Sequence, residues 1–279
     1  MRNRRLLLVP LILIVAILLF FWLRPETEAF GPAVALCPGP DLYGYTCDDA
    51  GGYAYIDATN DTGLYADDAT ITLDLPFPFT FYGTTYETVV ASTNGNLQFT
   101  TANAQYSNAC LAPEPAAAIG DLIAPYWDDL DLRFVGFLET ELSGEMPNRV
   151  FVIEWDSVPP FGANEDDTVT FAVQLHENSG DIVFLYEDVT TLESSNGRSA
   201  TIGIQSAAQG VALQFSCNQP AITDVSGLRI AHPAAANADL SPATPVTMTS
   251  TSVKICGRRI ERKGMRYRRS SKTLSIMAV

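Results

Sequence analysis

Three aspartates stand close together in the segment YWDDLDL. Asp128, Asp129 and Asp131 carry carboxylates that repel one another unless a cation lies between them. Calcium takes roughly six to eight oxygen ligands of this hard kind, so the three residues form a candidate Ca²⁺ site. The EF-hand pattern is absent, since Arg133 stands where that loop has Asp or Asn and no glycine follows. An acidic turn, with an aspartate that accepts backbone amide hydrogens, is the alternative.

A second pair of carboxylates is spaced as catalytic acids are in some β-sandwich enzymes. Glu154 and Asp156 are two residues apart on a predicted strand and therefore share a face. Glycoside hydrolases use two such groups about 5–5.5 Å apart, but the further carboxylate that would strengthen this interpretation is replaced by Val158. The sequence contains no G-x-S-x-G, P-loop or G-x-G-x-x-G motif. We therefore predict that the protein is not an enzyme, with a weakly supported hydrolase as the alternative.

The charge of the chain is divided into blocks. Between Pro25 and Val253 there is no lysine, and four arginines face 31 acidic residues, which gives a net charge of −27. Such a block repels phosphates, so no nucleic-acid partner is expected for it. The acidic run Glu165, Asp166 and Asp167 is predicted to be a solvent-exposed loop.

The N-terminal segment, residues 1–35, predicts a membrane address. Arginines at positions 2, 4 and 5 precede an apolar run from Leu6 to Leu23 that is long enough to span a bilayer as a transmembrane helix. The basic residues place the start of the chain in the cytoplasm. A single-pass membrane protein with an extracytoplasmic C-terminal domain is expected. The alternative is secretion after signal cleavage near Ala33-Val34-Ala35.

The C-terminal part changes composition twice. Residues 234–253 are rich in Pro, Ser, Thr and Ala and predict a linker. Residues 254–279 contain nine basic residues and one acid, and they predict a disordered basic tail. Contact with anionic lipid, with an envelope polymer or with the acidic domain is one interpretation of the tail. A reading-frame change within a longer gene is the other.

Four of the five cysteines lie in the acidic block, and an exported domain is where cysteines oxidise. Three pairings are open to four cysteines. We favour Cys37 with Cys47, which closes a short loop, and Cys110 with Cys217, which ties distant parts of one core. Cys256 is then left over.

Within the predicted domain, residues 36–233, period-two alternation of apolar and polar residues recurs across residues 50–232 and predicts strands with one buried face. In TVTFAVQLHE the apolar side chains share one parity, and His176 is expected on the solvent face. Helical periodicity is almost absent. The pattern predicts a single all-β domain, an antiparallel β-sandwich. Strands are expected at 70–75, 77–83, 86–93, 95–100, 132–138, 149–158, 168–177, 181–187, 199–206, 210–216 and 227–231.

Turn and aromatic residues refine this expectation. Asn94-Gly95 predicts a tight turn between strands, and Pro76 with Pro78 predicts an edge or irregular strand. A carbohydrate-binding module would need an exposed aromatic face. The aromatic residues whose exposure would decide this are Tyr53, Tyr55, Tyr82, Tyr86 and Trp155.

Several ordered motifs resemble the nidogen-like extracellular module and its relatives in secreted bacterial proteins. They are LPFPFTFYGTTYETVVASTNGNLQF at 75–99, IGDLIAPYWDDLDL at 119–132, and later NRVFVIEWDSV, DIVFLYEDV, GRSATIGIQ and LQFSCNQP. The resemblance covers about residues 37–233. It implies a non-catalytic, β-rich surface or adhesion module.

The expected function is therefore binding at a surface outside the cytoplasm, with an extracellular protein or glycan as partner and the membrane held through Leu6 to Leu23. Calcium is the one expected cofactor. A structural spacer or a truncated fragment of a larger secreted protein is the further alternative.

Overall fold

The structure is a computed structural model that describes residues 34–190 and 195–233. Those residues form fourteen strands and two short 3₁₀-helices, η1 (Ala117–Ile119) and η2 (Ser195–Gly197), and no α-helix occurs among them. The predicted membrane segment, the linker 234–253, the basic tail 254–279 and Cys256 lie outside the described residues. The all-β prediction is confirmed for the described part.

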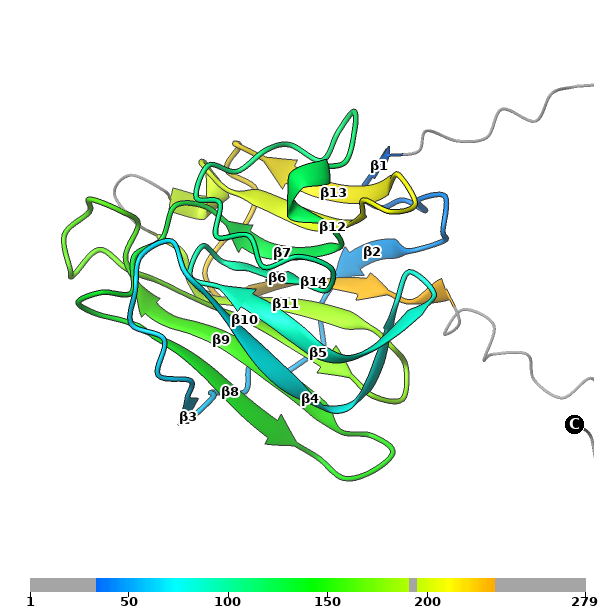
Figure 1. The fold of residues 1–279 in the computed structure, drawn as a ribbon, viewed down its shortest axis with the longest axis horizontal. Helices are drawn as coiled ribbons and strands as arrows, with labels where there is room; N and C mark the ends of the chain where they lie inside the picture. Colours follow the sequence, from blue (N-terminus) through cyan, green and yellow to red (C-terminus); the bar gives the residue numbers. More distant parts are fainter. Residues whose placement is uncertain (1–33, 191–194, 234–279) are drawn as a thin grey trace, which may run out of the picture. The chain divides into compact units, whose positions relative to one another are not determined.

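Two seven-stranded sheets pack face to face (Figure 1). The first sheet has the order β1 (Val34–Leu36), β13 (Val211–Cys217), β12 (Thr201–Ser206), β7 (Leu122–Trp127), β6 (Asn96–Gln98), β5 (Thr84–Ser92) and β4 (Thr70–Phe81). The second has the order β2 (Thr46–Asp49), β14 (Ser226–Ala231), β11 (Ile182–Asp188), β10 (Val169–His176), β9 (Val150–Val158), β8 (Phe137–Ser143) and β3 (Asn60–Asp61).

Neighbouring strands are antiparallel with one exception. The short strand β1 runs parallel to β13, with Val34 opposite Ala212. The prediction of a wholly antiparallel sandwich therefore needs this correction. The remaining pairs include the hairpin of β10 and β11, in which Leu175 lies opposite Ile182 across the predicted turn.

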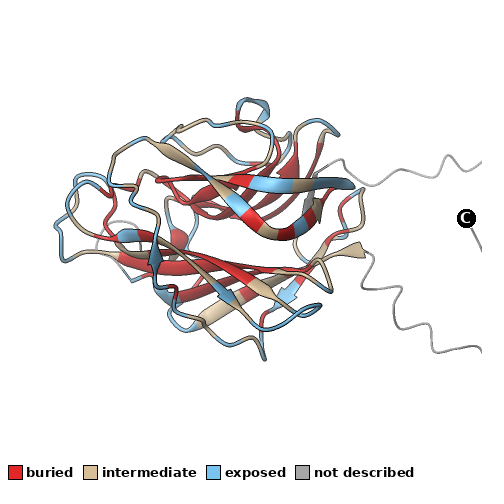
Figure 2. Ribbon diagram, turned by 60° about the horizontal axis from the view of Figure 1, so that its bottom comes forward, coloured by how far each residue is buried: buried red, intermediate tan, exposed pale blue. Residues whose placement is uncertain are grey.

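The main core fills the space between the sheets, where buried residues line both inner faces (Figure 2). It includes an aromatic stack in which the ring centroids of Trp155 and Phe171 lie 5.1 Å apart and those of Phe171 and Tyr126 lie 5.2 Å apart. Burial of such rings contributes roughly 25 cal/mol per Å² of apolar area removed from water. The alternation seen in the sequence supplies this inner face.

Parts of the outer faces are also covered, because long connections fold back over the sheets. Tyr53 and Tyr55 pack against a small cluster that contains Leu185, and Gln174 donates to the carbonyl of Ala54 at 2.9 Å. As a result β10 is buried on both faces for most of its length. The prediction that His176 faces solvent is wrong, since the ring is half-buried and lies 5.1 Å from Tyr53.

Some strand boundaries differ from the predicted ones. The predicted strand at 132–138 is mostly a loop, and β8 begins only at Phe137. Strand β7 was not predicted at all, because every residue in LIAPYW is buried and no alternation results. The segments around Pro76 and Pro78 form one strand, β4, which lies at the edge of its sheet as prolines predict.

Candidate functional site

The three predicted calcium ligands follow β7, but their carboxylates have different partners. Asp128 is buried and accepts a hydrogen bond from Ser199 Oγ at 2.5 Å. Asp131 is also buried and binds the Arg133 guanidinium through Nε at 2.9 Å and Nη2 at 2.6 Å. Within the described part of the chain, no hydrogen-bond donor contacts the Asp129 carboxylate. The three residues therefore do not form one cluster.

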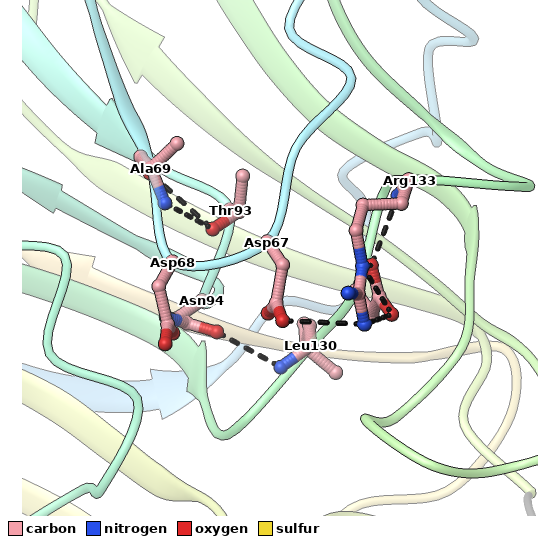
Figure 3. A network of polar contacts seen from close by, with 8 residues as sticks. Asp67, Asp68, Ala69, Thr93, Asn94, Leu130 and Arg133 are labelled. Atoms are coloured by element: carbon pink, nitrogen blue, oxygen red, sulfur yellow. Dashed lines mark hydrogen bonds and ion pairs between the residues drawn. The ribbon is translucent and has the colours of Figure 1, made fainter.

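Asp129 instead meets two aspartates from another part of the chain. Asp67 and Asp68 immediately precede β4, and each can offer one carboxylate oxygen within 4.8 Å of an oxygen of Asp129. An isolated antiparallel β-bridge between the backbones of Asp67 and Asp131 brings the two segments together. In Figure 3 the Asp67 carboxylate lies near Leu130 and is joined to the Arg133 guanidinium, whereas the Asp68 carboxylate lies beside the Asn94 amide. We call Asp67, Asp68 and Asp129 the aspartate cluster.

A fully buried asparagine positions two parts of this cluster. Asn94 donates from Nδ2 to Asp68 Oδ1 at 2.9 Å, and its Oδ1 accepts the backbone N–H of Leu130 at 2.9 Å (Figure 3). One side chain thus holds the segment before β4 and the segment after β7 in register. Asn94 comes from the predicted tight turn, which the structure confirms between β5 and β6.

The glycine of that turn is required by its surroundings. Gly95 has a φ of +67°, which L side chains rarely adopt, and a Cβ on it would lie 2.0 Å from the carbonyl oxygen of Tyr126. The turn therefore packs directly on β7. Trp155 donates from Nε1 to the carbonyl of Ser92 at 3.0 Å, so the core also fixes the strand that leads into the turn.

The pKa values of Asp129 and Asp131, which are close in sequence, are shifted in opposite directions. Burial, followed by the charges of Asp68 and Asp67, raises the pKa of Asp129 to about 6. Burial, followed by the charges of Asp131 and Asp68, also raises the pKa of Asp67. The hydrogen bond from Arg133 lowers the pKa of Asp131.

The two carboxylate oxygens of Asp67 also differ in their contacts. Its Oδ2 lies 3.3 Å from Arg133 Nη2, whereas its Oδ1 is buried without a hydrogen-bond partner. An unpaired buried oxygen beside other carboxylates is an unfavourable arrangement that a cation would relieve. The aspartate cluster is therefore the group around this loop pair that could hold a hard divalent cation.

A second group of three carboxylates lies on the outer face of the other sheet. It comprises Asp57, Glu154 and Glu187, which also bring oxygens within 4.8 Å of one another. Glu154 is buried, and it accepts hydrogen bonds from Tyr55 Oη at 2.7 Å and from the backbone N–H of Ala58 at 2.6 Å. Burial raises the pKa of Glu154 to about 7, although these two donors oppose the shift.

The predicted hydrolase pair is held by local donors. Glu154 is covered by the segment that carries Tyr55 and Ala58, and Asp156 accepts from its neighbour Ser157 at 2.9 Å. Both carboxylates therefore have bonds within the fold that the spacing alone did not indicate.

The aromatic residues that were considered for sugar binding are not an exposed face. Tyr82 and Trp155 are buried, and Tyr53, Tyr55 and Tyr86 are half-buried. Among the described residues, the exposed rings are others that the sequence did not single out: Tyr65, Tyr106, Phe134, Phe137 and Phe161. No pattern marked them as exposed: Phe134 and Phe137 fall in the strand predicted at 132–138, and the other three lie in loops.

Both favoured disulfides are present. Cys37 joins Cys47, and Cys110 joins Cys217 with Cα atoms 5.4 Å apart. Cys217 ends β13, so the second bridge ties the long connection after β6 to the first sheet.

The sequence analysis found Asp129 but missed Asp67, Asp68 and Asn94. The available signal was the pair Asp67-Asp68 directly before a predicted strand, together with a turn asparagine. Only the sheet order β7, β6, β5 and β4 brings these segments together.

In the described residues, no helix has the length and apolar character needed to cross a membrane. No curated protein and no solved structure matches the chain. A family model described as NIDO related matches residues 44–244, which is more than half of the chain and includes both carboxylate groups. Together with the disulfide-bonded sandwich, this match suggests a non-catalytic extracellular domain. The chain belongs to the nidogen-related family.

Proposed function

We propose that this chain is a non-catalytic surface-binding or adhesion module that acts outside the cytoplasm on an extracellular protein or glycan. The family, the two disulfides and the acidic composition support this role. We further propose that Leu6 to Leu23 anchors the chain in the membrane, with secretion after signal cleavage as the alternative.

We also propose that calcium stabilises the module at the aspartate cluster. The observation that carries this proposal is the convergence of Asp67, Asp68 and Asp129 from two segments, with Asp67 Oδ1 buried and unpaired. Asp128 and Asp131, which the sequence suggested as ligands, would then not bind the ion but would position Asp129. Their contacts with Ser199 and Arg133 fix the loop that presents Asp129.

Calorimetric titration of Ca²⁺ into the full chain, with thermal melts alongside, tests the calcium proposal. Binding to the folded state raises the melting temperature by mass action. We expect a rise with millimolar Ca²⁺ that is lost in Asp129→Asn. The matched control is Glu87→Gln, which removes one exposed carboxylate on β5 and should leave the rise intact. No heat and no shift would overturn the calcium proposal, as would an equal loss in both variants.

Bead attachment tests the binding role. Beads coated with the full chain should be retained on surfaces coated with extracellular protein or glycan, and Glu154→Gln should retain them equally well. Release of a glycan product by the parent chain, abolished in Glu154→Gln, would overturn the non-catalytic assignment. Equal retention of beads coated with an unrelated acidic protein would overturn the binding role.

A further inference from the structure

Four exposed aromatic side chains gather at the end of the sandwich where β8 begins and β9 ends. Phe134 is 71% exposed, Phe161 and Tyr65 are each 52% exposed, and Phe137 is 41% exposed. Tyr65 and Phe137 meet edge to face with ring centroids 6.0 Å apart. We call these four residues the aromatic rim. Tyr65, Phe134 and Phe161 come from three connections that are distant in the sequence, and Phe137 is the first residue of β8, so only the fold assembles them.

The rim lines two shallow depressions on the surface. One has a volume of about 540 Å³ and is bordered by Tyr65, Phe134 and Phe137. The other has a volume of about 270 Å³ and is bordered by Phe134 and Phe161. Phe134 and Glu165 belong to both, so the depressions form one continuous surface. Exposed apolar surface gathered in this way is typical of an interaction site.

The charge around the rim selects the kind of partner. Glu165 and Asp166 are exposed and border the larger depression. The one arginine at the rim, Arg133, is paired with Asp131 and Asp67. The residues that border the larger depression include the carboxylates of Glu165 and Asp166 and no lysine or arginine. The surface therefore combines carboxylates with aromatic faces, whose π electrons attract cations.

Arg133 shows how this surface holds a cation. Its guanidinium carbon lies 5.3 Å from the centre of the Phe134 ring and 5.5 Å from that of Phe161, while its nitrogens contact carboxylates. Three of the four rim residues are phenylalanines, which offer no hydrogen bond to a sugar hydroxyl. Stacking and charge, rather than hydroxyl recognition, are the interactions that the rim offers.

We propose that the aromatic rim binds an arginine-bearing extended segment of a partner protein, with guanidinium groups placed over Phe134 and its neighbours and paired with Glu165 and Asp166. This inference rests on the proposed function as a surface-binding module and names the chemistry of its partner. The net charge of −27 between Pro25 and Val253 would attract such a segment from a distance and would make association sensitive to salt.

Fluorescence anisotropy with the full chain tests the proposal. The probe is a labelled peptide of alternating glycine and arginine, and its matched control replaces every arginine by citrulline, which keeps the shape and removes the charge. We expect the arginine peptide to bind more tightly. Phe134→Ser should weaken that binding about 5-fold, within the range of cation–π contacts. Met146→Ser, which removes an apolar side chain that is 73% exposed, should leave it unchanged.

Charge variants complete the test. Glu165→Gln should weaken binding about 2-fold to 3-fold at low salt, and Glu87→Gln should have no effect. Because all these side chains are exposed, each variant should melt with the parent chain, and Phe161→Ser replaces Phe134→Ser if that variant does not. Equal binding of the two peptides, or equal effects of the two glutamate variants, would overturn the proposal.

A glycan occupant gives a different result. Binding of a neutral oligosaccharide to the full chain, if it is lost in Phe134→Ser, would overturn the proposal in favour of sugar recognition. Bead retention that persists while the arginine peptide fails to bind would overturn only the identity of the partner. Failure of both would count against the proposed function as well.

Discussion

The two groups of three carboxylates differ in what the protein supplies to them. Glu154 is covered and receives hydrogen bonds from Tyr55 Oη and from the Ala58 N–H. The Asp129 carboxylate receives no hydrogen bond from the described residues, and Asp67 leaves one buried carboxylate oxygen unpaired. A buried acid with its own donors stabilises the segment that provides them. Acids that converge with fewer donors than acceptor oxygens instead repel one another, and an external cation can relieve that repulsion.

The largest expected difference comes from truncation of the covered acid. Glu154→Ala leaves the Ala58 N–H and the Tyr55 hydroxyl without their acceptor and opens space beneath that segment. We expect a loss of about 2–4 kcal/mol in the free energy of unfolding. Urea unfolding measures it. A loss below about 0.5 kcal/mol would show that the covering segment does not depend on Glu154.

The next effect concerns the residue that positions the aspartate cluster. Asn94→Ala removes the contacts with Asp68 and Leu130 at a site with no solvent exposure. We expect a loss of about 2–3 kcal/mol and a weaker response to calcium. Chemical unfolding with and without Ca²⁺ measures both quantities. A destabilised variant with an unchanged calcium response would mean that Asn94 does not position the ligands.

A pH series distinguishes the charged form of Glu154 from the neutral form. Its folded pKa of about 7 lies above the ordinary 4.5, so the folded state favours the protonated acid. This contribution to stability is complete below about pH 4.5 and is lost as the pH rises through 7. Glu154→Gln should remove that loss. The free energy of unfolding should then fall by about 1–2 kcal/mol less between pH 5 and 8 than in the parent chain, after allowance for solvent screening. Parallel profiles for the two proteins would contradict this.

The smallest effect has the most informative sign. The pKa of Asp129, about 6 against an ordinary 3.8, means that its contribution to stability is lost as the pH rises through 6. In a calcium chelator at pH 8, Asp129→Asn should therefore stabilise the chain by up to about 1 kcal/mol, a value discounted for exposure. Thermal melts measure it.

Asp131→Asn is the matched contrast, two residues away. It breaks the contact with Arg133 that lowers the pKa of Asp131, so it should reduce stability where Asp129→Asn increases it. If the free energy of unfolding changes with the same sign in both variants, the distinction between the paired Asp131 and the unpaired Asp129 carboxylate is wrong.

Much of the fold could be predicted from local patterns. Asn94-Gly95 specifies its turn because positive φ needs glycine, and Pro76 with Pro78 specifies an edge because proline cannot donate to a neighbouring strand. Strand β7 could not be predicted by alternation, because both of its faces are buried. Phe134 could not be distinguished from a strand residue, because apolar loop residues and apolar strand residues look alike in sequence.

The sequence by itself determined the β-rich class, the division of charge and one residue of the aspartate cluster, because each follows from residue type, order or short-range spacing. It favoured one of three cysteine pairings, and the structure confirms that pairing. Only the tertiary structure decided which carboxylates meet. Asp129 lies about 60 residues from Asp67 and Asp68 in the chain, and strand pairing in one sheet sets their distance. The aromatic rim depends in the same way on three separate connections and the start of β8, which meet at one end of the sandwich.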